Sequence, residues 1–245
     1  MAGHSKWANI KHRKGAQDAR RAKVFTKIAR EILVAARSGG GDPAANPRLR
    51  TAIAEARAAN MPNERIDKAI KKGTGEGSGA AYEEVLYEGY APGGVAVHVI
   101  ALTDNRNRTT SEVRHLFSKN GGELGSPGSV AWMFERKGFV AVPVDAIDEE
   151  RLLELVLEAG GEDMQREGDQ FEIVTEPDAF LAVREALEAQ EIAIGSAEVS
   201  MQPQNVVALD REKAEKVVNL LEALDDHDDV QKVAANLQLS EAATT

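Results

Sequence analysis

The order of strands and helices across residues 138–202 is the feature that most constrains the fold of this chain. The apolar stretch at 139–144 indicates a strand, and an amphipathic helix, a hairpin and a second amphipathic helix follow it. A last strand is expected at 192–201. The order β-α-β-β-α-β is typical of the ferredoxin-like fold. We therefore expect residues 137–204 to form a ferredoxin-like domain within an α+β protein.

A second sheet is indicated by two strand-like stretches that precede this segment. Residues 82–90 and 95–102 predict strands joined by a short turn, and the second is apolar at nearly every position. Such a strand is expected in the centre of a sheet, with both faces covered. A helix is expected over 108–119 and a third strand over 130–134. One helix can cover only one face of this small sheet.

The C-terminal tail is expected to complete the second sheet. An amphipathic helix begins at Asp210, and apolar residues from Val230 onward predict a helix or a strand that returns to the sheet. We expect the tail helix to cover the face that the first helix leaves bare. This arrangement predicts a middle α/β domain made of residues 80–136 and 205–245, with residues 137–204 inserted between them.

Charge is distributed unevenly along the chain. Residues 1–72 hold 17 basic and 6 acidic residues, whereas residues 73–245 hold 13 basic and 34 acidic residues, and the net charge is −10. A basic end on an acidic body is typical of a protein whose basic end binds a polyanion. Nucleic acid is the polyanion that we expect.

The basic end is predicted to be a helical domain over residues 1–75, with three helices behind a basic arm. The first helix is expected over 18–37, the second begins after Asn46, and the third ends at Gly73. The polar face of the first helix is almost entirely positive, so we interpret it as a nucleic-acid-binding surface; the alternative is a face that contacts only solvent. The expected nucleic-acid-binding residues of the arm and this helix are Lys6, Lys11, His12, Arg13, Lys14, Arg20, Arg21, Lys23, Lys27 and Arg30.

Two arginines near the start of the helix expected over 108–119 suggest an anion site. Arg106 and Arg108 lie where the free backbone N–H groups of a helix already make its end positive. Several positive groups focused on one point are typical of phosphate binding. The alternative is that both arginines pair with nearby carboxylates.

The composition argues against several classes of function. The chain has no cysteine, which excludes disulfides and thiolate zinc sites. Its five histidines are scattered, and no Ser/His/Asp, HExxH or paired-carboxylate signature is present, so we expect neither catalysis nor a cofactor. The glycine-rich segment 73–79 lacks the preceding strand and the Gly-Lys-Ser/Thr of a phosphate-binding loop, and we interpret it as a linker.

The sequence DDHDD at residues 225–229 is the one plausible cluster of ligands for a hard cation. It lacks the Asp/Asn spacing, the glycine and the terminal glutamate of a calcium-binding loop. We therefore interpret this segment as a solvated acidic turn and expect no metal.

The chain shows no sign of a membrane segment. No apolar run approaches the roughly 20 residues of a membrane span. The basic N-terminus lacks the apolar segment and the cleavage site of a signal peptide, although an amphipathic, arginine-rich start also resembles a transit peptide. We expect a cytoplasmic location.

Four motifs resemble the YebC/PmpR family. They are GHSKWANIKHRK at 3–14, RAKVFTKIAREI at 21–32, NMPNERIDKAIKKG at 60–73 and TDNRNRT at 103–109. The resemblance spans the full chain and implies three domains, namely an N-terminal helical bundle and two α/β domains. The family includes bacterial proteins described as transcriptional regulators and the mitochondrial translational activator of cytochrome c oxidase. The resemblance supplies no catalytic residue, and its basic positions correspond here to Lys6, Lys11, His12, Arg13, Lys14, Arg21, Lys23, Lys27 and Arg30.

These features predict a nucleic-acid-binding regulator of gene expression that is not an enzyme, with a DNA-binding transcriptional regulator as the first interpretation. The alternative is a ribosome- or rRNA-associated factor that activates translation or relieves stalled ribosomes, because the basic residues indicate phosphate contacts, which carry no sequence information. The expected partner is duplex DNA or structured rRNA, with the ribosome as a further candidate. We expect no membrane partner, and a monomer or a weak dimer.

Overall fold

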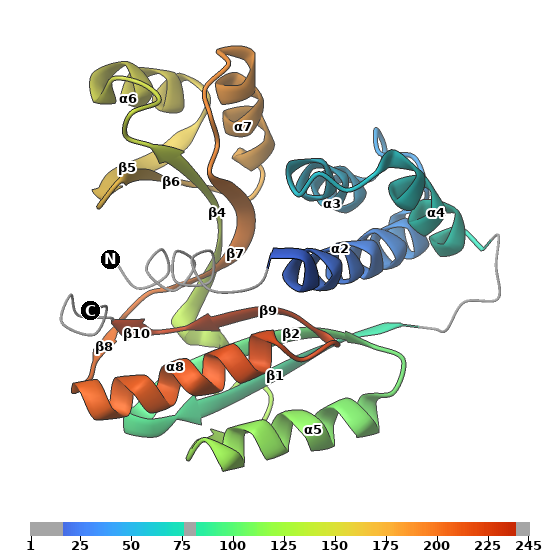
Figure 1. The fold of residues 1–245 in the computed structure, drawn as a ribbon, viewed down its shortest axis with the longest axis vertical. Helices are drawn as coiled ribbons and strands as arrows, with labels where there is room; N and C mark the ends of the chain where they lie inside the picture. The colour runs from blue at the N-terminus through green and yellow to red at the C-terminus, as the bar shows by residue number, and fades with distance from the viewer. Residues whose placement is uncertain (1–16, 76–81, 239–245) are drawn as a thin grey trace.

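Three helices form the N-terminal part of the protein within the ranges that the structure describes (Figure 1). The structure is a computed structural model and describes residues 17–75 and 82–238. The helices are α2 (Gln17–Gly39), α3 (Pro47–Ala58) and α4 (Asn63–Gly73). Their apolar faces meet in one buried cluster, as the helical spacing predicts, and its members include Ile32, Ala36, Leu49, Ala52, Ile66 and Ala69.

Local contacts determine where these helices begin and how closely they approach each other. The side chain of Asn46 accepts the backbone N–H of Leu49 at 3.1 Å and donates to the carbonyl oxygen of Ala35 at 2.8 Å. One residue therefore caps α3 and joins it to α2. At the end of α4, a Cβ on Gly73 would lie 2.5 Å from the carbonyl oxygen of Leu33, so only glycine permits this approach of α4 to α2.

The second part of the protein is built on an antiparallel four-stranded sheet of order β3-β1-β2-β9. Its strands are β1 (Glu83–Ala91), β2 (Val95–Thr103), β3 (Glu123–Leu124) and β9 (Val230–Ala235), and the 3₁₀ turn η1 (Pro92–Gly94) joins the first two. The apolar strand β2 is central, as expected. A short parallel pair is formed by β8 (Val207–Ala208), which precedes β9 in the chain, and β10 (Leu237–Gln238), which follows it.

Two helices, α5 (Arg106–Lys119) and α8 (Arg211–Asp225), cover the same face of this sheet (Figure 1). Phe117 of α5 and Leu221 of α8 belong to one buried cluster with Val97 of β2. The expectation that the tail helix covers the opposite face is therefore wrong. An amphipathic pattern gives a helix an apolar face but does not determine which side of the sheet it meets.

The opposite face of the sheet packs against the other two parts of the protein. Leu102 of β2 is buried against Leu33 and Val34 of α2. Further along the same strand, Ala96 is buried in a cluster with Phe134 of the ferredoxin-like part. The central strand is thus covered on both faces, and the second cover is supplied by neighbouring parts of the chain.

The inserted segment forms an antiparallel sheet of order β5-β6-β4-β7 with two helices packed on it. Its elements are β4 (Phe134–Pro143), α6 (Glu149–Glu158), β5 (Gly161–Glu167), β6 (Gln170–Thr175), α7 (Phe180–Ala189) and β7 (Ser196–Pro203). The α+β class and the order of a ferredoxin-like unit are confirmed. The domain boundaries at 1–75, 80–136 with 205–245, and 137–204 remain a proposal. Within the described ranges, no helix is long and apolar enough to cross a membrane.

The strand expected over residues 130–134 is wrong. Residues Ala131–Met133 form the 3₁₀ turn η2, and the third strand of the sheet is the short β3 instead. The reason lies in Glu88, whose carboxylate accepts the backbone N–H groups of Gly128, Val130 and Ala131 at 2.6–2.7 Å. These donors are therefore not free to pair with a neighbouring strand.

Candidate nucleic-acid interface

Five of the predicted nucleic-acid-binding residues have described side chains. They are Lys23, Lys27 and Arg30 on α2, and Arg106 and Arg108 on α5. The described ranges leave out Lys6, Lys11, His12, Arg13 and Lys14, and they do not describe the side chains of Arg20 and Arg21.

The basic face of α2 lies against the C-terminal end of α8 and the acidic turn that follows it, residues 225–229. Lys27 Nζ donates to the carbonyl oxygen of Asp225 at 2.5 Å. Lys23 Nζ lies 3.2 Å from both the carbonyl oxygen and Oδ1 of Asp226. The last carbonyl groups of a helix have no partners within it and make its end negative, so cations are favoured there. The lysines of α2 therefore complete the end of α8.

Asp229, at the end of the acidic turn, connects three elements. Its Oδ1 lies 3.1 Å from Arg30 Nη1, and its Oδ2 lies 2.7 Å from both Arg108 Nη2 and Thr109 Oγ1. Burial would raise the pKa of Asp229, but Thr109, Arg108 and Arg30 hold the pKa below its ordinary value. Only 4% of Asp229 is exposed, so the expectation of a fully solvated turn is wrong for this residue.

The two arginines of α5 also lie beside carboxylates. Arg108 Nη2 is 3.1 Å from Asp104 Oδ1 in addition to its bond with Asp229, and Arg106 Nη1 is 4.0 Å from Glu83 Oε2. These pairs correspond to the alternative interpretation of the two arginines. Phosphate binding by Arg106 and Arg108 stays a prediction.

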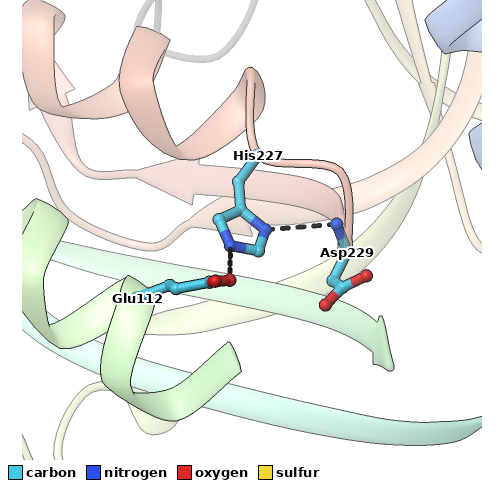
Figure 2. Close-up of side chains that lie close together, drawn as sticks. All are labelled: Glu112, His227 and Asp229. Atoms are coloured by element: carbon cyan, nitrogen blue, oxygen red, sulfur yellow. Dashed lines mark hydrogen bonds and ion pairs between the residues drawn. The ribbon is translucent and has the colours of Figure 1, made fainter. Parts of the chain in front are cut away.

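Glu112, His227 and Asp229 come together on the same side of the protein (Figure 2). His227 Nδ1 accepts the backbone N–H of Asp229 at 3.1 Å, so a neutral ring carries its proton on Nε2 and donates it to Glu112 Oε2 at 2.8 Å. Binding of a metal through Nε2 would move that proton to Nδ1 and break the bond from Asp229. The three residues therefore form a hydrogen-bonded connection between α5 and the acidic turn.

A second set of cations lies exposed on α4. Arg65, Lys68, Lys71 and Lys72 are all exposed, and none forms an ion pair with another described residue. The sequence places them opposite the apolar residues Ile66, Ala69 and Ile70, but it did not mark them as binding residues. The helical spacing of these cations relative to Glu64 and Asp67 on the same helix is the signal that could have found them.

A cavity of about 440 Å³ lies where α3, the sheet β3-β1-β2-β9 and strand β7 meet. His98 lines it, is only 4% exposed and lies with its ring centroid 5.9 Å from that of Phe134. Burial lowers the pKa of His98, although the carboxylate of Glu88 opposes this effect. His98 is therefore neutral at pH 7.

The basic helical bundle, the sheet completed by the C-terminal tail and the ferredoxin-like insertion define a class of α+β proteins with a distinctive order of parts. Residues 5–76 match the domain described as "TACO1/YebC protein N-terminal domain", and residues 82–237 match "TACO1/YebC second and third domain". The chain belongs to the TACO1/YebC family, as the resemblance of its motifs predicts.

Relatives in several bacteria are similar over nearly the whole chain. A protein of Carboxydothermus hydrogenoformans named "Probable transcriptional regulatory protein" is 58% identical over 98% of this chain and 99% of its own length. A protein of Rubrobacter xylanophilus with the same name is 56% identical over 98% of this chain and 97% of its own length. The crystal structure of a conserved hypothetical protein from Aquifex aeolicus superposes with a TM-score of 0.87 at 52% identity, covering 98% of this chain and 99% of that protein.

Proposed function

We propose that this protein is a non-enzymatic regulator of gene expression that binds duplex DNA and acts on transcription in the cytoplasm. The observation that carries the proposal is the concentration of positive charge in the N-terminal 72 residues of an otherwise acidic chain. The names of the relatives support transcription as the process, and they favour DNA over the ribosome as the target.

The charge distribution supports binding through phosphates more than through bases. Lysines and arginines that contact phosphates position a protein on DNA and supply most of its salt-dependent affinity. Sequence is read by side chains that reach base edges in the grooves. None of the three described helices of the bundle is rich in Asn, Gln and Arg together, so we propose binding with weak sequence preference.

The basic arm provides the first test. Changing Lys11, Arg13 and Lys14 to Ala should weaken binding to all duplexes alike, because each lost phosphate contact removes about 0.9 from the slope of log K against log salt concentration. We expect the magnitude of the slope to fall by about 2–3 in the triple variant. The measurement is fluorescence anisotropy of labelled duplexes of unrelated sequence over a series of salt concentrations.

The control for this test is a variant in which three cations in the acidic part of the protein are changed. Arg211, Lys213 and Lys216 on α8 are exposed and lie 2.9–3.1 Å from carboxylates of the same helix or of its N-cap, Asp210. Changing them to Ala should leave the slope unchanged. A wild-type slope near zero, or an arm variant that loses one sequence and keeps the others, would contradict the proposed phosphate-based binding.

A further inference from the structure

We propose that Arg65, Lys68 and Lys72 form a stripe on α4 that binds the phosphate backbone of one strand of duplex DNA. This inference rests on the proposed function and assigns a surface to it. The stripe is exposed and free of ion pairs within the described residues. The predicted cations of α2 are different, because their side chains already hold the end of α8 and the acidic turn.

The positions around the helix separate the stripe from the acids of α4. At about 100° per residue, Arg65, Lys68 and Lys72 lie within roughly 60° of one another around the helix axis. Lys71 lies outside this stripe, between Glu64 and Asp67 in the same projection. The stripe therefore contains only cations, and the mixed-charge surface of Glu64, Lys71 and Asp67 lies next to it on the exposed side of the helix.

The stripe has a rigid support. Ile66 and Ala69 on the inward face of α4 are buried in the bundle core, and Gly73 lies directly against the backbone of α2. The guanidinium carbon of Arg65 lies 5.6 Å from the centroid of the Phe25 ring, a cation–π contact that orients the first cation of the stripe. Figure 1 shows α4 on the outer side of the bundle, turned away from both sheets.

The length of the stripe fits the spacing of phosphates. From Arg65 to Lys72 the helix rises about 10 Å, at 1.5 Å per residue. One strand of duplex DNA carries a phosphate about every 3.4 Å along the duplex axis, so the stripe extends over about four phosphates. The stripe is therefore long enough to contact more than one phosphate of the strand.

The helix dipole does not account for this arrangement. A cation in the last turn, such as Lys72, is favoured by the negative end of a helix, but Arg65 lies in the first turn, where cations are disfavoured. No carboxylate among the described residues pairs with Arg65. Glu64 supplies a carboxylate in the same turn, and a DNA phosphate would give Arg65 the direct anionic partner that the described residues do not.

The test compares two variants of the full-length protein with the same composition of changes. The stripe variant is Arg65→Gln, Lys68→Gln, Lys72→Gln, and the control is Arg211→Gln, Lys213→Gln, Lys216→Gln on α8, where each cation has its own carboxylate. Fluorescence anisotropy with a labelled DNA duplex of mixed sequence is measured over a series of salt concentrations. The stripe variant should lower the magnitude of the salt slope by about 2–3, and the control should match the wild type.

Two single variants keep the proposal testable if the triple variant unfolds. Circular dichroism reports whether the triple variant keeps its helix content; if it does not, the single changes Lys68→Gln and Lys71→Gln decide the matter. We expect Lys68→Gln to reduce the slope by about 0.9 and Lys71→Gln to leave it near the wild-type value. Equal effects of the two lysines would overturn the assignment of a stripe.

The outcomes distinguish this inference from the proposed function. A wild-type protein that binds the duplex with a steep salt slope, together with a stripe variant that binds equally well, overturns the stripe and leaves the function intact. A wild-type protein with no salt-dependent binding to the duplex overturns both. Binding of a labelled RNA hairpin that depends on the stripe, without binding to the duplex, overturns the choice of DNA.

Discussion

Asp229 shows how much the environment of a single residue can differ from its sequence context. In the sequence it is one of four aspartates around His227, and nothing distinguishes it from Asp226 or Asp228. In the structure it is buried and accepts bonds from Arg30 and Arg108, whereas the other two aspartates are exposed. The contacts come from helices more than 100 residues away in the chain, which local pattern cannot reveal.

Changing Asp229 to Asn should destabilise the protein, because Arg30, Arg108 and Thr109 would lose their charged acceptor. We expect the free energy of unfolding in urea to fall by about 1–3 kcal/mol. The matched control is Asp228→Asn, which removes a carboxylate of the same turn whose side chain is exposed. A control variant as unstable as Asp229→Asn would show that the net charge of the turn, and not the buried contact, is responsible.

The same residue gives a dependence on pH with a defined sign. The pKa of Asp229 is lowered in the folded protein, despite burial, by Thr109, Arg108 and Arg30. Its contribution to stability is therefore fully present above the unfolded pKa of about 3.9 and is lost as the pH falls through the folded pKa. Urea unfolding over a pH series should show the wild type and Asp229→Asn converging only below about pH 4.

At the scale of elements, periodicity predicts the helices and strands well and their partners poorly. The helix expected over 18–37 is Gln17–Gly39, and the strand expected over 95–102 is Val95–Thr103. The strand expected over 130–134 does not form, because the carboxylate of Glu88, far away in the sequence, accepts the backbone N–H groups of Val130 and Ala131. The basic face of α2 was visible in the sequence, but its contact with the end of α8 depends on the folded arrangement.

The contact between α2 and the acidic turn can be measured as a coupling between two side chains. Lys27 and Asp225 are both largely buried, and Lys27 Nζ lies 3.4 Å from Asp225 Oδ1. A double-mutant cycle with Lys27→Gln and Asp225→Asn should give a coupling energy of about 0.5–1.5 kcal/mol from urea unfolding. A parallel cycle with Lys27→Gln and Glu212→Gln, whose carboxylate pairs with Lys216 on α8, should give nearly zero. Equal couplings would mean that the effect is one of net charge.

At the scale of the whole molecule, Lys232 joins all three parts of the fold. It lies on β9, its Nζ donates to the carbonyl oxygen of Val199 on β7 at 2.6 Å, and it lies 3.4 Å from Glu55 Oε1 on α3. Burial would lower the pKa of Lys232, but Glu55, Glu198 and Glu31 keep it raised. The sequence predicts the parts and the insertion, whereas contacts like these decide how the parts are arranged.

Changing Lys232 to Met should destabilise the protein strongly, because Glu55 would lose its counterion in a site where burial already raises its pKa. We expect a loss of roughly 3 kcal/mol in the free energy of unfolding. Adding Glu55→Gln should recover much of this loss, since the second change removes the unpaired charge. A double variant as unstable as Lys232→Met would indicate that the bond to Val199 matters more than the ion pair.

The position of β9 in the chain also has a consequence for synthesis. His98 of β2 pairs with Ala234 of β9, which emerges from the ribosome 136 residues later. At a synthesis rate of about 5–20 residues per second, β9 becomes available for pairing roughly 7 to 27 s after the central strand β2. During that interval β2 presents an open edge that can pair with another nascent chain. Aggregation of newly made protein should therefore depend on how quickly the ribosome translates the segment between these two strands.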